Sequence, residues 1–179
     1  PLALLRFHDH LLKVLPPLME FPGFENKSRE IASVMLRDFK ESIFKEPVYS
    51  HSLCYALEGL MGLREKGFPE VEELIFRGVE FLSQIQREDG GISSFSGGEK
   101  ESFPVSDATA QAARLWLIID KEKYQRELKK AFSFLFSLKV PGGGILYHPK
   151  SSDQNAWATI FTIQAFLFAR VSPEIENLI

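Results

Sequence analysis

Two polar stripes inside otherwise apolar helical segments hold the residues best suited to chemistry. Both follow the helical spacing i, i+4 and i+7, which places the members of each stripe on one face of a helix. The stripes consist of His51, Tyr55 and Glu58 in one segment and of Asp107, Gln111 and Arg114 in a later one. Two such stripes in neighbouring helices indicate a polar binding or reaction centre.

The stripes suit acid–base chemistry on a sugar. A carboxylate that gives or takes a proton near a second polar group is the arrangement that glycosidic-bond chemistry requires. Glu58 or Asp107 could be that acid or base, with His51 or Tyr55 assisting. Two structural interpretations stay open, because Asp107 also suits a helix N-cap and Glu58 with Arg114 suits an ion pair between helices.

Further candidates surround the start of the last predicted helix. Tyr147 and His148 lie on the loop that enters it and are expected to rim a pocket. Trp116 and Trp157 are expected mainly in the core, although an aromatic face also suits stacking on a sugar. The residues predicted to contact a substrate are Tyr55, Gln111, Arg114, Tyr147, His148, Asn155 and Trp157.

No metal or cofactor is expected. Cys54 is the only cysteine, so the chain has no internal disulfide and no thiolate metal cluster. HExxH, GxSxG and a phosphate-binding glycine loop are missing from the sequence, and the glycines at 142–144 indicate a turn. A single cysteine favours a reducing compartment, and we expect a cytoplasmic location.

Composition bounds the class of protein. The chain has 179 residues, 45% hydrophobic and 25% charged, which predicts one domain over 1–179 with a sizeable core. Most of its 16 phenylalanines fall in periodic segments and are expected to pack in that core. A net charge of −3 without a basic stripe argues against nucleic acid as a partner. No apolar run approaches the roughly 20 residues of a membrane span.

Periodicity and helix-breaking residues predict an all-α fold of about seven helices. The predicted ranges are 2–15, 28–44, 51–66, 69–87, 107–119, 124–139 and 153–171. Pro16 and Pro17 are expected to end the first helix. Ser28 and Asp153 are expected to cap the second and the last.

The chain also repeats itself. Six positions recur with the same offset of 53 residues, namely Phe81, Leu82, Ile85, Gly90, Gly91 and Ile92 against Phe134, Leu135, Leu138, Gly143, Gly144 and Ile145. In each copy an amphipathic helix, a glycine turn and a loop lead to a helix rich in small residues. The small residues allow close contact on several sides, so we expect these helices to form an inner layer.

These motifs resemble the α/α-toroid superfamily, which includes six-hairpin enzymes acting on sugars and prenyltransferase and squalene-cyclase toroids. FLSQIQREDGGI (81–92) is similar to the helix-end and turn signature of that superfamily. HSLCYALEGL (51–60) and NAWATIFTIQAFL (155–167) are similar to its sugar-associated members. The resemblance covers 49–170 and implies a central pocket lined by the first turns of the inner helices.

The resemblance also sets expectations about completeness. The chain supplies fewer hairpins than a closed toroid, which implies a partial or open toroid: an excerpt of a longer chain, a reduced arc, or half of an assembly. An open inner face would favour a partner domain or self-association. The zinc ligands and the Asp-rich acid motif of the prenyltransferase and cyclase members are missing here.

Three functions follow as expectations. The first is a carbohydrate-related domain that binds or processes a saccharide in a central pocket. The second is a non-catalytic helical-repeat module that binds a protein, in which the polar residues would pair with each other and an apolar patch would lie elsewhere. The third is a prenyl or terpenoid site, which would be lined by phenylalanines.

Overall fold

The computed structural model describes residues 9–43, 47–97 and 102–170. Within them seven α-helices form: α2 (Asp9–Leu18), α3 (Glu25–Ser42), α4 (Ser50–Glu65), α5 (Glu72–Gln84), α6 (Ser106–Asp120), α7 (Gln125–Ser137) and α8 (Ala156–Arg170). A short 3-10 helix, η1 (Pro69–Val71), precedes α5. The predicted all-α class is confirmed. None of these helices is long and apolar enough to cross a membrane.

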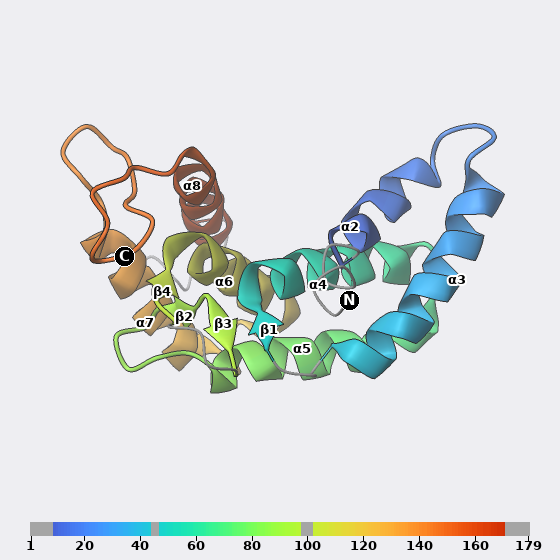
Figure 1. The fold of residues 1–179 in the computed structure, drawn as a ribbon, viewed down its shortest axis with the longest axis horizontal. Helices are drawn as coiled ribbons and strands as arrows, with labels where there is room; N and C mark the ends of the chain where they lie inside the picture. Colours follow the sequence, from blue (N-terminus) through green and yellow to red (C-terminus); the bar gives the residue numbers. More distant parts are fainter. Residues whose placement is uncertain (1–8, 44–46, 98–101, 171–179) are drawn as a thin grey trace.

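The helices form two layers that curve into an open arc (Figure 1). The inner layer is α2, α4, α6 and α8, in which α4 packs against α2 and α6, and α6 packs against α8. Each of the first three inner helices also packs against the outer helix that follows it: α2 against α3, α4 against α5, and α6 against α7. The arc itself is thus built by inner helices standing side by side. Closure into a toroid stays a prediction.

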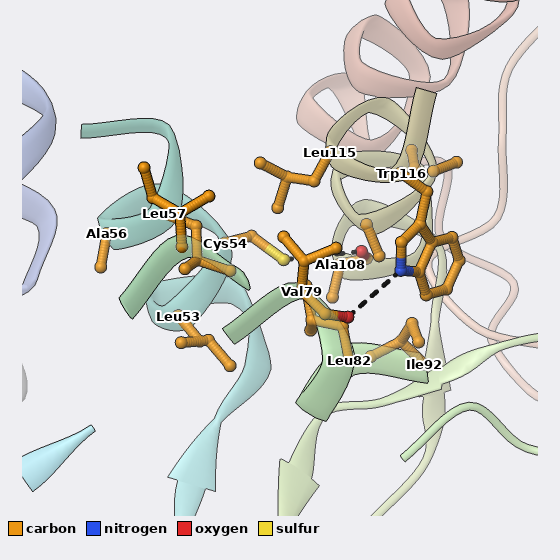
Figure 2. Packing of buried hydrophobic residues seen from close by; sticks show 14 of the residues in the cluster. Leu53, Cys54, Ala56, Leu57, Val79, Leu82, Ile92, Ala108, Leu115 and Trp116 are labelled. Atoms are coloured by element: carbon orange, nitrogen blue, oxygen red, sulfur yellow. Dashed lines mark hydrogen bonds between the residues drawn. The ribbon is translucent and has the colours of Figure 1, made fainter. Parts of the chain in front are cut away.

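Residue size explains the layers. The inner helices α4 and α6 bury nearly every side of their first turns, because small residues such as Ala56, Gly59 and Ala110 let neighbours approach closely. The outer helices are amphipathic and bury one stripe, which in α7 consists of Leu128, Ala131, Phe132, Phe134 and Leu135. Trp116 of α6 lies in the core between the layers and donates its indole N–H to the carbonyl of Val79 in α5 (3.3 Å; Figure 2).

Short antiparallel strand pairs fix the loops that enter the inner helices. Strand β1 (Val48–Tyr49) pairs with β3 (Phe95–Ser96), and β2 (Ile92–Ser93) pairs with β4 (Pro104–Val105). Because β1 leads into α4 and β4 leads into α6, these pairs hold the first turns of the two helices at the same end of the array.

The sequence repeat has a structural counterpart in the glycine turns. The N–H of Arg87 donates to the carbonyl of Gly91 (2.9 Å), and the same bond recurs 53 residues later from Val140 to Gly144 (3.0 Å). The equivalent Gly90 and Gly143 both have a positive φ, of 91° and 95°, but the turns differ one residue earlier, where Gly142 has φ 102° and the equivalent Asp89 has no positive φ.

One predicted helix end is wrong. Helix α2 continues through Pro16 and Pro17 to Leu18. Pro16 packs on α4, where a Cβ added to Gly62 would lie 2.7 Å from its ring, so tertiary packing accommodates prolines in the last turn of α2. The predicted start of this helix, 2–8, lies outside the described residues.

The predicted N-caps are wrong as well. Helix α3 begins at Glu25, one turn before Ser28. Helix α8 begins after Asn155, whose Oδ1 accepts the N–H of Ala158 (2.9 Å), so Asn155 and not Asp153 caps it. The predicted end of this helix at residue 171 lies outside the described residues, as does that of α3 at 44.

Candidate functional site

His51 and Asp107 meet across the interface between α4 and α6. Each lies in the first turn of its helix, and His51 Nδ1 is 3.1 Å from Asp107 Oδ2. The other oxygen, Oδ1, accepts the N–H of Ala108 (2.7 Å). Asp107 does not cap α6, because the helix already begins at Ser106. His51 Nδ1 makes no hydrogen bond among the described residues, so its contact with Asp107 is an electrostatic one at this distance.

The two groups differ in exposure. The side chain of His51 is 18% exposed, whereas Asp107 is buried, with 9% of its side chain exposed, so the pair is reached from solvent mainly through His51.

Glu58 lies between two cations. Its Oε1 is 3.1 Å from Arg114 Nη1, and its Oε2 contacts Lys13 Nζ of α2. Arg114 Nη1 also donates to Gln164 Oε1 of α8 (3.0 Å). The predicted ion pair of Glu58 with Arg114 is confirmed, and it is the centre of a polar line that joins all four inner helices.

Tyr55 is surrounded by rings and a cation. Its ring centroid lies 4.7 Å from that of His51, 5.0 Å from that of His10 and 6.1 Å from that of Phe161. Lys13 Nζ is 4.2 Å from the ring centroid, within cation–π distance. Burial raises the pKa of Tyr55, and the negative charge of Glu58 adds to the effect, so the phenol stays protonated and can donate.

His10 extends the group toward α2. Its ring centroid is 5.9 Å from that of His51. Burial lowers the pKa of His10, and the positive charges of His51 and Lys13 lower it further. The imidazole of His10 is therefore a neutral donor and acceptor near neutral pH.

Gln111 lies one helical turn beyond Asp107. It is fully buried, and neither polar atom of its side chain has a hydrogen-bond partner among the residues that the structure describes. A buried polar group without a partner costs about 1–3 kcal/mol. Gln111 therefore supplies hydrogen-bonding capacity that the surrounding side chains do not use.

Together these residues form one group on the inner layer. We call the following set the inner-layer cluster: His10, Lys13, His51, Tyr55, Glu58, Asp107, Gln111 and Arg114. All six residues of the two predicted stripes belong to it. His10, Lys13 and Gln164 were missed by the sequence analysis, because their contacts cross from α2 and α8.

The two predicted loop residues, Tyr147 and His148, differ in their relation to the cluster. The phenols of Tyr147 and Tyr49 share a hydrogen bond, and burial raises the pKa of Tyr147, with the nearby charge of Asp107 adding to this effect. Tyr147 therefore borders the cluster. His148 instead stacks on Phe103, with centroids 5.3 Å apart.

The two residues predicted at the start of α8, Asn155 and Trp157, also have different roles in the structure. Asn155 uses its side chain to cap the helix. Trp157, expected mainly in the core, is 64% exposed, because it lies on a face of α8 that no described helix covers. Its ring lies against Phe161 (6.1 Å), which in turn lies 6.2 Å from His51. Trp116 is fully buried, as expected.

Comparisons of the chain with protein-family models, with curated proteins and with solved structures give no match. The resemblance to α/α-toroids therefore remains a prediction. Among the described residues no group of three or more His, Cys, Asp or Glu side chains could hold a metal ion.

Proposed function

We propose that the inner-layer cluster binds a saccharide. The observation that carries this proposal is the contact of His51 with Asp107 at 3.1 Å, in which the His51 side chain is 18% exposed and is bordered by aromatic rings. Such a pair presents a donor and an acceptor to a ligand hydroxyl at the open side of the inner layer.

The chemistry of the neighbours fits a polyhydroxylated ligand. A sugar hydroxyl both donates and accepts, and the Asp107 carboxylate and the Tyr55 phenol together supply both functions. Trp157 is exposed and offers a ring face one ring away from His51, with the buried Phe161 between them, and aromatic faces stack on the apolar side of a sugar.

Charge balance favours a neutral saccharide. The cluster holds two carboxylates, Glu58 and Asp107, and two permanent cations, Lys13 and Arg114. A diphosphate needs cations that are not already paired, and both cations here contact Glu58.

The packing of the phenylalanines also argues against a prenyl or terpenoid ligand. The buried phenylalanines belong to the hydrophobic core and comprise Phe39, Phe68, Phe132, Phe134 and Phe161. Of these only Phe161 has a ring contact with the inner-layer cluster.

The roles within the cluster differ. His51 and Asp107 are the pair suited to move a proton if the bound saccharide is also processed. Glu58 is held by two cations, so we assign it to positioning Lys13 and Arg114 rather than to proton transfer.

A thermal-shift screen tests binding. The panel holds neutral hexasaccharides of cellulose, mannan, xylan and chitin, beside oligouronates and farnesyl diphosphate. A ligand at about 100 times its Kd adds roughly 2.7 kcal/mol, which moves the midpoint by several degrees. The proposal predicts a shift with a neutral saccharide that Asp107→Asn reduces and Asp153→Asn, an exposed control on the same loop side, leaves unchanged. A shift with farnesyl diphosphate alone would contradict it.

A second function, a protein-interaction module, is favoured by a different observation. Lys13, Glu58, Arg114 and Gln164 pair in one line across the inner helices, as expected for residues that hold a repeat array in register. If no ligand of the thermal-shift panel raises the unfolding temperature, the result would favour this protein-interaction module.

A further inference from the structure

Equivalent positions on successive inner helices contact each other. His51 meets Asp107 and Glu58 meets Arg114, and both pairs are 56 residues apart in sequence, counted from 51 to 107 and from 58 to 114. From α6 to α8 the separation is 50 residues, as in the bond of Arg114 to Gln164. These separations define which residues of different inner helices occupy the same position.

Each inner helix has one face toward the helix that follows it. On α4 this face includes Cys54, whose Sγ is 3.9 Å from the carbonyl oxygen of Ala108 in α6 (Figure 2). The position equivalent to Cys54 is Ala110 on α6 and Ile160 on α8. Cys54 and Ala110 are fully buried, whereas Ile160 is 46% exposed.

The same difference recurs two turns later, at the position of Met61 on α4 and Leu117 on α6. Met61 and Leu117 are partly buried and pack against the core, whereas the equivalent Leu167 on α8 is 54% exposed. Ile163, which is 53% exposed, is equivalent to Leu57, and Leu57 packs on Gly78 of the outer helix α5, so Ile163 does not belong to this face. We call Ile160 and Leu167 the forward face of α8.

The opposite end of the array presents the complementary face. Lys13 with Glu58 and His10 with Tyr55 are each 45 residues apart, counted from 13 to 58 and from 10 to 55, which relates α2 to α4. A Cβ added to Gly59 of α4 would meet the backbone of Leu12 and Lys13, so Gly59 faces backward, toward α2.

The residues of α2 that should face backward are exposed. Val14 is equivalent to Gly59, and Leu11 is equivalent to the fully buried Ala56. Leu11 and Val14 are 46% and 47% exposed. We call these two residues the backward face of α2.

We propose that copies of this chain associate end to end, with the forward face of α8 in one copy packed on the backward face of α2 in a second copy. The contact continues the interface already formed between α4 and α6 and between α6 and α8. Both faces are apolar, and Arg170, at the last position, is the single charged residue of α8. Next to these faces, Gln164 of one copy lies at the position that would meet Lys13 on α2 of the other.

The contact is heterologous, because two different faces meet. Such contacts close into a ring or continue as a filament, according to the rotation between copies. Ile160 stands where the internal interfaces use Cys54 and Ala110, and Val14 stands where they use Gly59, so the joint between copies has a wider helix separation than the internal ones. The proposal does not depend on saccharide binding.

Two complementary variants test it. Ile160→Glu blocks the forward face and Leu11→Glu blocks the backward face, while Phe136→Glu, at a 63% exposed position of the outer helix α7, is the control. Mass is measured by light scattering after size exclusion over a concentration series, and circular dichroism checks that each variant is folded.

The expected result is specific to a heterologous contact. Wild type and Phe136→Glu associate with rising concentration, and each face variant alone is a monomer. An equimolar mixture of the two face variants forms a dimer and stops there, because one copy keeps its forward face and the other its backward face. A monomeric wild type at every concentration would overturn the proposal. So would association of Leu11→Glu by itself, which would show α8 pairing with α8 or another surface in use.

Discussion

Glu58 of α4 and Arg114 of α6 occupy equivalent positions on neighbouring inner helices, and their charged groups lie 3.1 Å apart. The side chains are 11% and 15% exposed, so water screens the pair only partly. Lys13 on one side and Gln164 on the other extend it into a line across the inner layer. This line fixes the register in which the first turns of α4 and α6 present His51 and Asp107.

Removing Arg114 should therefore destabilise the fold. Arg114→Met leaves Glu58 with Lys13 alone and takes the donor from Gln164. We expect a loss of about 2 kcal/mol in the free energy of unfolding, between the values for exposed and buried pairs. The measurement is urea unfolding followed by circular dichroism. Arg77→Met, which breaks an exposed pair with Glu73 on α5, is the control and should change stability by less than about 0.5 kcal/mol. Equal losses in the two variants would refute the register role of the line.

Asp107→Asn should weaken saccharide binding while changing the stability of the fold less. The amide keeps the shape of the side chain and can still accept the N–H of Ala108, but it loses the charge beside His51. We expect saccharide affinity to fall about tenfold, equivalent to about 1.4 kcal/mol, with a smaller effect on stability. Calorimetric titration with the oligosaccharide that gives the largest thermal shift provides the measurement. Undiminished affinity would remove Asp107 from the site.

Trp157→Ala should affect binding and not stability. Its ring is 64% exposed, so truncation removes little buried area. If the ring stacks on a sugar, affinity should fall by about 1 kcal/mol or more. Phe136→Ala is matched in exposure at 63% and lies on the outer helix α7. Comparable losses of affinity in both variants would argue against a localised sugar-stacking surface.

The stability of the fold should depend on pH through His10. Because burial and the charges of His51 and Lys13 lower its pKa in the folded state, the unfolded chain binds more protons between that lowered pKa and 6.5. The contribution is fully present above pH 6.5 and is lost as the pH falls through this window. Urea unfolding of wild type and His10→Gln at pH 7.5 and 5.5 isolates it. The stability of wild type should fall more than that of the variant, and parallel losses would contradict the assignment.

Local pattern predicted the helices better than their ends. Inner helices could be recognised from small residues such as Ala108, Ala110 and Ala112, because close packing on several sides leaves no room for larger ones. The ends depended on contacts that the sequence does not display. Pro16 stays inside α2 because it packs on α4. Asn155 rather than Asp153 caps α8, because the loop backbone positions it at the first free N–H groups.

The sequence predicted about half of the candidate site, namely the part that lies on two of its four inner helices. The i, i+3 spacing of Tyr55 with Glu58, and of Gln111 with Arg114, identified two of the four inner helices that contribute. The same spacing relates His10 to Lys13 and Phe161 to Gln164, and comparing the helices in register would have found these residues. Trp157 could not be placed, because its exposure depends on which helices stand beside α8.

Tryptophan fluorescence tests the central claim, that the inner-layer cluster and its aromatic border bind a saccharide. The chain has two tryptophans, of which Trp116 is fully buried and Trp157 is 64% exposed, so iodide quenching reports on Trp157. Wild type and Asp107→Asn are titrated with the neutral hexasaccharides of the thermal-shift panel. We expect that one of these saccharides shifts the Trp157 emission of wild type to shorter wavelength and protects Trp157 from iodide quenching. Both effects should be weaker in Asp107→Asn. Unchanged emission and quenching with every saccharide, in a protein that is folded, would contradict it.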